Sequence, residues 1–445
     1  MGLSGLDIYK LLPKTNCREC GYSNCLAFAL AIAKKAVSID KCPHISKDVK
    51  QKLLEAVLPA MKLIEIGIND RKSLTGQETV LFRHEEKFHN PCLLGYILDD
   101  NLNEEEFDKR LLDISNIKFE RVGEIIKLDL IALRNKSNNS EKFKNCIKKI
   151  ALLSNLNIVI ITDNLQILKE SIDIIKSNNA LIYFTKDLTD TNVLDLLKKY
   201  NPPIVISADR LEEFDNIIPK LIDIGLNNLV LETKSKNVQN KLWDLTQIRR
   251  LALKKKNRAF GFPQLVTVKK DDDFSGVMQA ATFITKYANV ILLENFGLED
   301  IFALLTLRQN IYSDPQKPLQ VEPKAYAIGQ VTDNSPVLVT TNFSLTYYTV
   351  LSEVEASKIP SYIAAINTEG MSVLTAWAAE KFTPESITKG INDYAIKDKV
   401  KHNKIIIPGY VANMNKHLED LSKTKVIVGP KEASGIPSLL KSLYK

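Results

Sequence analysis

Four of the six cysteines in this 445-residue chain lie within its first fifty residues. Cys17, Cys20, Cys25 and Cys42 have the spacing C-x2-C-x4-C-x16-C, and Pro43 follows the last of them. Iron–sulfur clusters use four cysteine thiolates, often with a more distant fourth ligand and a proline beside one of them. Structural zinc sites more often use two separate C-x2-C pairs. The spacing therefore favours a 4Fe-4S cluster ligated by these four cysteines, with structural zinc and disulfides as alternatives.

Two short helices are expected to position these cysteines. Residues 4–12 begin with a serine and are followed directly by a proline, which is typical of a short capped helix. Residues 26–33 are Leu, Ala, Phe and Ile, so we expect a helix that packs over the cluster and leads to the fourth ligand. We predict a small N-terminal cluster domain over residues 1–57 and a linker over 58–78.

The composition is that of an ordinary globular protein, with 45% hydrophobic and 25% charged residues. The 60 basic and 53 acidic residues give a net charge of +7, and no clustered basic face with interleaved aromatics is evident, so nucleic-acid binding is not expected. No apolar run reaches the roughly 18 to 20 residues that span a bilayer, and no secretory signal opens the chain. These features predict a cytoplasmic protein without a membrane segment, in a reducing compartment that suits a metal cluster.

The middle of the chain, over residues 79–310, alternates short apolar runs with polar stretches of helical periodicity. Such runs are typical of parallel strands buried on both faces. Eight of them predict a central (β/α)8 TIM barrel. Asp163, Asp209 and Glu232 lie at strand ends, where they are either catalytic groups or helix caps. The eight runs are Leu93–Leu98, Ile126–Leu133, Ile158–Thr162, Ala180–Thr185, Pro203–Ser207, Asn228–Glu232, Leu265–Val268 and Val290–Glu294.

The end of the chain predicts a second α/β unit. A proline-rich connection over 311–335 precedes an open α/β (Rossmann- or flavodoxin-like) domain over 336–445. The turns after its strands are rich in Gly, Ser, Thr and Ala, so backbone N–H groups can approach a large ligand at the edge where such sheets bind ligands. Ordinary capped turns are the alternative. Neither a G-x-G-x-x-G nor a G-x-x-x-x-G-K-[ST] motif is present, so the signature of a dinucleotide or nucleoside triphosphate site is missing.

These features together resemble the large subunit of the corrinoid/iron–sulfur protein of the acetyl-CoA (Wood–Ljungdahl) pathway. The resemblance rests on the four-cysteine spacing, the run at 79–84 and two C-terminal stretches, residues 367–379 and 428–437. It implies a multidomain α/β protein with an N-terminal iron–sulfur domain, a TIM barrel and a C-terminal corrinoid-binding domain. It also implies a heterodimer with a smaller subunit.

The function implied by this resemblance is that of a methyl carrier. Cob(I)amide would take a methyl group from methyl-tetrahydrofolate or methyl-tetrahydropterin on a methyltransferase, and methyl-Co(III) would pass it to the nickel site of acetyl-CoA synthase/CO dehydrogenase. The cluster, fed by a low-potential electron donor, would reduce inactive Co(II). The chain would thus be one component of a methyltransferase system and not a stand-alone catalyst.

The resemblance also implies site residues. The four clustered cysteines would ligate the metal, and no side chain would be catalytic, since the corrinoid cobalt is the nucleophile. The missing Asp-x-His-x-x-Gly motif fits a base-off, cobalamin-type corrinoid without a histidine ligand. The residues implied to contact the corrinoid are Thr340, Thr346, Gly370, Met371, Ser372, Val373, Thr375, Gly409, Gly429, Ala433, Gly435 and Ile436.

Two other functions remain as alternatives. A pterin methyltransferase that uses its own barrel would need a pterin-binding constellation at the strand ends. An electron-transfer protein without corrinoid would leave the small-residue turns of the last domain without a use.

Overall fold

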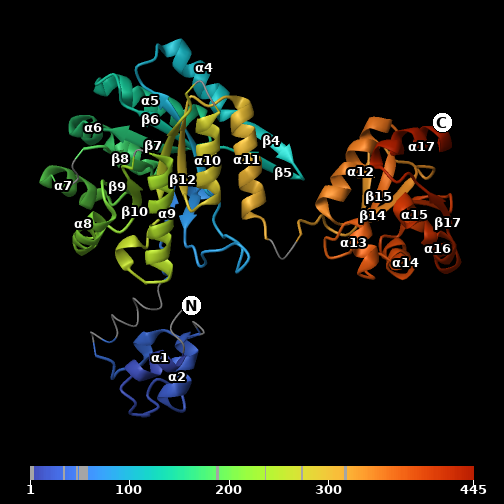
Figure 1. Ribbon diagram of the computed structural model, residues 1–445, viewed down its shortest axis with the longest axis horizontal. Helices are drawn as coiled ribbons and strands as arrows, with labels where there is room; N and C mark the ends of the chain where they lie inside the picture. Colours follow the sequence, from blue (N-terminus) through green and yellow to red (C-terminus); the bar gives the residue numbers. More distant parts are fainter. Residues whose placement is uncertain are drawn as a thin grey trace. The chain divides into compact units, whose positions relative to one another are not determined.

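The computed structural model describes residues 5–33, 36–46, 49, 59–186, 190–235, 237–271, 274–314 and 318–444. The chain divides into two compact units (Figure 1): the first comprises Met1–Lys118 and Lys127–Tyr312, and the second comprises Phe119–Ile126 and Ser313–Lys445.

The N-terminal residues form two short helices with a small core of their own. Helix α1 spans Gly5–Leu11, α2 spans Cys25–Ala33, and a 3-10 turn, η1, follows at Ile39–Lys41. Both expected helices are present, although residue 4 lies outside the described residues. Their apolar side chains pack together with those of the intervening loops, and the buried members are Ile8, Leu12, Cys25, Phe28, Ala29, Ile32 and Ile39.

A β-hairpin lies within residues 58–78, where we expected a linker. Strand β1 (Leu63–Ile66) pairs antiparallel with β2 (Ser73–Gly76), and both isoleucines of β1 are buried in the barrel interior. The Thr75 hydroxyl donates to the carbonyl of Asn289, which directly precedes a barrel strand, at 3.2 Å. The hairpin therefore covers the amino-terminal end of the barrel. Its packing into the barrel comes from the two alternating isoleucines, Ile64 and Ile66.

The predicted barrel is confirmed as eight parallel strands in the order β10-β9-β8-β7-β6-β3-β12-β11, and a parallel bridge between Leu231 and Gln264 joins β10 to β11. Inward side chains such as Ile97, Ala132 and Val205 fill its interior. The strands are β3 (Leu93–Asp99), β6 (Leu130–Arg134), β7 (Asn157–Thr162), β8 (Leu181–Phe184), β9 (Ile204–Ala208), β10 (Leu229–Thr233), β11 (Leu265–Lys269) and β12 (Val290–Glu294).

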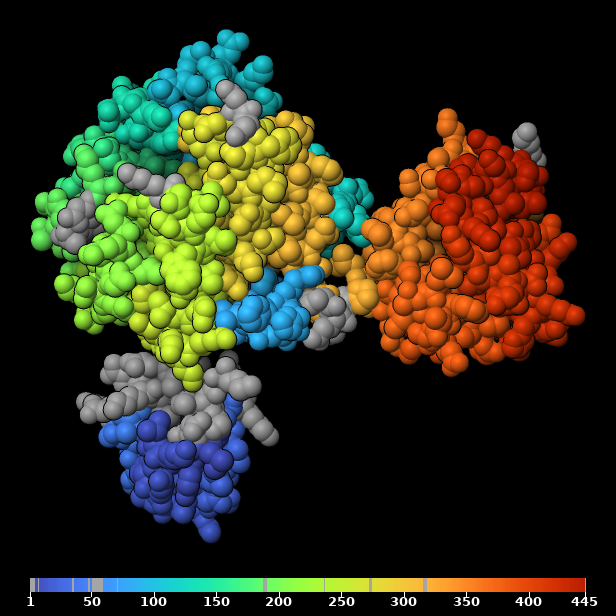
Figure 2. All heavy atoms as spheres, viewed as in Figure 1, coloured from blue at the N-terminus to red at the C-terminus, as the bar shows by residue number. Residues whose placement is uncertain are grey.

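Helices cover the outside of the barrel, and in the space-filling view the side chains of α9, α10 and α11 hide the strands behind them (Figure 2). Several of these helices begin at an Asn or Asp whose side chain accepts from a first-turn N–H group, as Asn103 does from Glu106 N at 2.8 Å. The helices are α4 (Glu104–Ser115), α5 (Ser140–Leu153), α6 (Leu165–Ser177), α7 (Thr191–Tyr200), α8 (Leu211–Asp223), α9 (Val238–Leu253), α10 (Ser275–Thr285) and α11 (Leu298–Tyr312).

The single strand expected over 126–133 is wrong. Strands β4 (Lys118–Arg121) and β5 (Glu124–Lys127) form a separate two-stranded sheet, and only Leu130–Arg134 enters the barrel. The break falls at Asp129, whose carboxylate accepts from Leu94 N at 2.9 Å and pairs with Arg308.

The C-terminal residues form an open five-stranded sheet in the order β13-β15-β14-β16-β17, parallel except for β13. Strand β13 lies inside the connection expected over 311–335. Because β15 and β16 lie on opposite sides of β14, the strand order reverses there, and such switch points are where open α/β sheets bind ligands. The strands are β13 (Ala325–Ile328), β14 (Val337–Thr341), β15 (Ser361–Ile366), β16 (Lys404–Ile407) and β17 (Lys425–Val428).

Helices pack on both faces of this sheet, each over its own apolar core. One core joins Val339 and Ile407 of the sheet to α14 (Pro384–Asp393) and α16 (Asn415–Ser422). The other core joins the opposite face to α12 (Ser344–Ser357) and α17 (Ile436–Leu443), and the remaining elements are α13 (Val373–Ala378), α15 (Ile396–Lys399) and the 3-10 turns at Gly409–Met414 and Ala433–Gly435. In the part of the chain that the structure describes, no helix is both long and apolar enough to cross a membrane.

Candidate functional site

The four clustered cysteines gather around the start of α2 and the end of η1. Cys25 is the first residue of α2, Cys42 follows η1, and Cys17 and Cys20 lie in the loop before α2. The Asn16 side chain accepts from Cys25 N at 2.9 Å, while Asn16 N donates to Cys25 Sγ at 3.4 Å. This pair of bonds folds the loop back onto the start of the helix.

The sulfurs are close enough to influence one another electrostatically. Burial raises the pKa of the Cys42 thiol, and the charges of Cys20, Cys17 and Cys25 raise it further, while the backbone N–H of His44 lowers it. Four thiolates in one place repel each other, so a cationic metal centre among them would stabilise the set. All six cysteines are free in this structure, and this donor set of four soft sulfurs fits an iron–sulfur cluster or zinc.

A second polar group lies beside the cysteines. His44 Nε2 is 3.1 Å from Glu19 Oε2, and ligand atoms of Cys17, Glu19 and His44 lie within 4.8 Å of one another. All three residues are exposed, and the histidine ring is already paired with the glutamate. The Glu19–His44 pair therefore lies at the exposed side of the cysteine loop.

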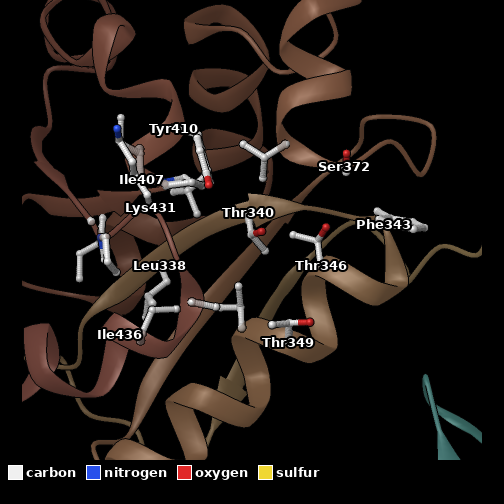
Figure 3. Close-up of a pocket in the computed structure, with 18 of the residues that line it drawn as sticks. Leu338, Thr340, Phe343, Thr346, Thr349, Ser372, Ile407, Tyr410, Lys431 and Ile436 are labelled. Atoms are coloured by element: carbon white, nitrogen blue, oxygen red, sulfur yellow. The ribbon is translucent and has the colours of Figure 1, made fainter.

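A pocket of about 370 Å³ lies at the carboxyl ends of β14 and β16, at the switch point of the C-terminal sheet (Figure 3). Its walls are mostly apolar, with Leu338, Ile407 and Ile436 among them. The described residues that line it include no histidine, cysteine, methionine or carboxylate. The pocket is thus suited to an apolar face of a ligand, and it offers no strong metal ligand of its own.

One buried polar side-chain atom among the described residues of this pocket lacks a partner. Thr340 at the end of β14 is 1% exposed, and its Oγ1 has no hydrogen-bond partner among the described residues. The Thr340 side chain points into the pocket together with those of Thr346 and Ser372 (Figure 3). A buried hydroxyl without a partner costs free energy, which a ligand with a polar group could recover.

The residues implied by the resemblance fall into two groups. Seven of them line the pocket, namely Thr340, Thr346, Ser372, Val373, Gly429, Ala433 and Ile436. The other five do not line it, namely Gly370, Met371, Thr375, Gly409 and Gly435. A Cβ added at Gly409 would lie 2.6 Å from the Gly429 carbonyl oxygen, and one at Gly435 would lie 2.7 Å from Pro430 Cβ. These two glycines therefore let neighbouring loops pack closely.

Some lining residues were missed by sequence reasoning. Thr349 and Val350 extend the face of α12 that begins with Thr346, and this helical spacing could have identified them. Tyr410 and Lys431 lie in loops, and no sequence pattern predicts that they line the pocket. The Tyr410 hydroxyl donates to Glu432 Oε1 at 2.6 Å, and this bond raises the pKa of Tyr410.

The mouth of the barrel holds polar groups that pair with each other. Arg134 on β6 bonds both Asp99 on β3 and Glu294 on β12, with 2.9 Å between its Nη2 and Glu294 Oε1. Tyr183 and Ser207 both donate to Glu232, one of the predicted catalytic candidates. A second candidate, Asp163, forms an exposed ion pair with Lys186 at 3.4 Å, and the third, Asp209, is exposed beside the start of α8.

The chain is a multidomain α/β protein with a parallel barrel and an open α/β sheet. It has four clustered free cysteines near its start and a separate pocket at the switch point of the open sheet. The chain belongs to the family described as CO dehydrogenase/acetyl-CoA synthase delta subunit, whose model matches residues 63–440. A model described as a putative Fe-S cluster matches residues 12–44, which contain all four clustered cysteines.

The relatives agree with this family. The chain is 39% identical over 436 residues to the corrinoid/iron-sulfur protein large subunit of Moorella thermoacetica, with 98% of both chains covered. It is 34% identical over 456 residues to the acetyl-CoA decarbonylase/synthase complex subunit gamma of Methanothermobacter thermautotrophicus, covering 100% of this chain and 99% of the relative. The resemblance stated from the sequence is thereby confirmed. Among solved structures, a dihydropteroate synthase of Yersinia pestis covers 49% of this chain and 92% of its own at 14% identity and a TM-score of 0.38, which is too weak to support an argument.

Proposed function

We propose that this chain is a methyl carrier that holds a corrinoid in the pocket of its C-terminal domain and an iron–sulfur cluster at its four cysteines. It would accept a methyl group from methyl-tetrahydrofolate or methyl-tetrahydropterin on a methyltransferase and deliver it to an acetyl-CoA synthase/CO dehydrogenase. The observation that supports this most is the pocket at the switch point between β14 and β16, apolar and without a metal-ligating side chain, in a chain that also gathers four thiols.

The lining residues fit a corrinoid by their chemistry. When bound, a corrinoid supplies a cobalt nucleophile that accepts and releases a methyl group. Leu338, Ile406 and Ile436 would pack against an apolar face of the ligand and exclude water, while the Thr340 hydroxyl would find a polar partner. With no histidine among the lining residues, the protein would leave the cobalt without a side-chain ligand, as expected for a base-off form.

The four-cysteine site would serve as the entry point for electrons. Burial, together with the charges of the neighbouring thiolates, raises the pKa of the Cys42 thiol, so its thiolate form costs free energy without a bound cation. A bound cluster would remove this cost and make the N-terminal part a low-potential electron carrier, of the 4Fe-4S type by its cysteine spacing. The expected partners are a small subunit that completes a heterodimer, the methyltransferase, the synthase and a low-potential electron donor.

The first experiment is to measure iron, zinc and cobalt in the protein purified without oxygen together with its small subunit. About four irons and one cobalt per chain, with a Co(I) absorption band on reduction, are expected. Iron without cobalt would instead support the electron-transfer alternative, and zinc without either would contradict the proposal.

A cysteine variant tests the cluster separately from the corrinoid. In Cys20→Ala we expect loss of the cluster iron and of reductive reactivation, with cobalt content and transfer from an already methylated protein retained. Cys146→Ser is the matched control, because Cys146 lies buried in α5 far from the cysteine cluster in the sequence, and it should keep its iron. Unchanged reactivation in Cys20→Ala would contradict the electron-entry role.

A further inference from the structure

The loop Thr368–Ser372 forms part of the pocket wall, but the contacts that fix this loop are made outside the pocket. Ser372 and Val373 line the pocket, whereas Thr368 and Gly370 are buried behind it. Gly370 has a φ of +75°, a conformation that residues with a Cβ rarely adopt. The position of this wall therefore depends on contacts made by residues that do not touch the pocket.

The side chain of Asn342 makes those contacts. Asn342 follows β14, is fully buried, and does not line the pocket. Its Oδ1 accepts from Thr368 N at 2.9 Å and from Gly370 N at 3.1 Å, and it lies 3.1 Å from the Thr368 hydroxyl. Because both backbone groups can only donate, the orientation of the Asn342 amide is fixed by chemistry.

The other end of the same side chain bonds a third segment. Asn342 Nδ2 donates to Gln320 Oε1 at 3.0 Å and lies 3.5 Å from the carbonyl oxygen of Val321. This segment also presses on the loop, since a Cβ on Gly370 would lie 3.0 Å from Gln320 Cγ and 3.1 Å from Pro318 Cβ. The loop is thus fixed between Asn342 and the chain that enters the domain.

We infer that Asn342 is a positioning residue for ligand binding: through Thr368 and Gly370 it sets the place of the wall formed by Ser372 and Val373. The inference rests on the proposed corrinoid function for the identity of the ligand. An ordinary structural asparagine would affect only stability. A positioning asparagine also changes affinity for the ligand, and a variant that keeps the acceptor oxygen restores that affinity.

The test uses the complete chain with its small subunit and cobinamide as the probe. In Asn342→Ala we expect faster hydrogen exchange at the amides of Thr368 and Gly370, and cobinamide affinity lower by about tenfold, the equivalent of one hydrogen bond's contribution. Asn342→Asp keeps an acceptor for both amides, and Gln320 can turn its NH2 group toward it, so exchange and affinity should return toward those of the wild type.

Controls separate this inference from the proposed function. Asn367→Ala removes an exposed hydrogen bond to Glu369 N in the same turn and should leave cobinamide affinity unchanged. If Asn342→Ala does not fold, Gly370→Ala, which strains the same loop, should show the loss of affinity. If the wild type binds cobinamide tightly and Asn342→Ala and Gly370→Ala bind it equally well, the inference is overturned. Absence of binding by the wild type, with both amides protected, would instead overturn the proposed function.

Discussion

The carboxyl ends of the barrel strands and those of the C-terminal sheet differ in how their polar side chains find hydrogen-bond partners. At the barrel mouth, Arg134 is bonded to Asp99 and Glu294, and Glu232 accepts from two hydroxyls. At the edge of the C-terminal sheet, the Thr340 hydroxyl faces a pocket with apolar walls and has no partner among the described residues.

The difference follows from the two topologies. A closed barrel places the ends of its strands in a ring, so inward side chains face one another and can pair. An open sheet whose strand order reverses sends its loops apart at the switch point and leaves a crevice. Unpaired groups in a crevice indicate a ligand more strongly than paired groups at a barrel mouth, because the pairs are already satisfied. Arg134, Asp99, Glu294 and Glu232 are therefore better explained as paired groups that join neighbouring strand ends than as free catalytic groups.

The largest expected effect comes from filling the pocket. Thr346→Trp places an indole where the structure has a cavity of about 370 Å³, and we expect corrinoid affinity to fall by about a hundredfold or more because the ligand and the indole compete for space. Cobalt content and cobinamide titration measure this. Ser352→Trp, on an exposed position of the same helix outside the pocket lining, is the control and should bind normally.

Breaking the barrel pairing should affect stability and leave binding intact. Arg134→Met leaves the Glu294 carboxylate without its arginine and leaves Asp99 with only Lys136, at 3.8 Å. Because these carboxylates are 19% to 26% exposed, we expect a loss of about 2 kcal/mol in the free energy of unfolding. Chemical denaturation measures the loss. A fall in corrinoid affinity in this variant would contradict the separation of the two regions.

A third variant, at Tyr183, tests how the free energy of unfolding depends on pH. Burial, and then the charge of Glu232, raises the pKa of Tyr183. As the pH rises, the Tyr183 hydroxyl therefore loses its proton in the unfolded chain before it does so in the folded protein. The stabilisation that this hydroxyl contributes is present below about pH 10 and is lost as the pH rises further. Tyr183→Phe should cost about 1 kcal/mol at pH 7, and the gap to the wild type should narrow or reverse near pH 11. If the free energies of unfolding of the two proteins changed with pH in the same way, the Tyr183 hydroxyl would not be buried beside Glu232 as described.

The smallest effect compares two neighbouring hydroxyls. Thr340 and Thr341 are both buried and lack partners among the described residues, but only Thr340 lines the pocket. Replacing either with valine removes an unsatisfied group, so neither change should lower the free energy of unfolding by more than about 1 kcal/mol. Thr340→Val should weaken cobinamide binding by about three- to tenfold, and Thr341→Val should not. Equal affinities in both variants would remove Thr340 from the site.

The sequence was sufficient where local patterns determine structure. Every barrel strand except β6 matches an expected apolar run closely, and the cysteine spacing is also a local pattern, so both could be read from the sequence. The β1–β2 hairpin could not, because its strands are only four residues long and the burial of Ile64 and Ile66 depends on distant strands. Strand β13 follows a proline-rich stretch that suggests no strand.

The pocket was predictable in place but not in detail. Small residues after the strands located the edge, yet Gly409 and Gly435 pack against neighbouring loops and do not line the pocket. The hydrogen bonds of Asn342 depend on how three separated segments meet, and one sequence contains no signal for that. Side-chain direction in loops is determined by tertiary packing.

The hairpin at the base of the barrel also constrains how the chain folds during synthesis. Its isoleucines, Ile64 and Ile66, find their partners among strands that reach to β12, and the bond from Thr75 to Asn289 joins residues 214 positions apart. At about 5 to 20 residues per second, β12 is made on the order of 10 to 40 s after the hairpin. The site of the hairpin is complete only after β12 has been made, so the first strands made are among the last to be buried.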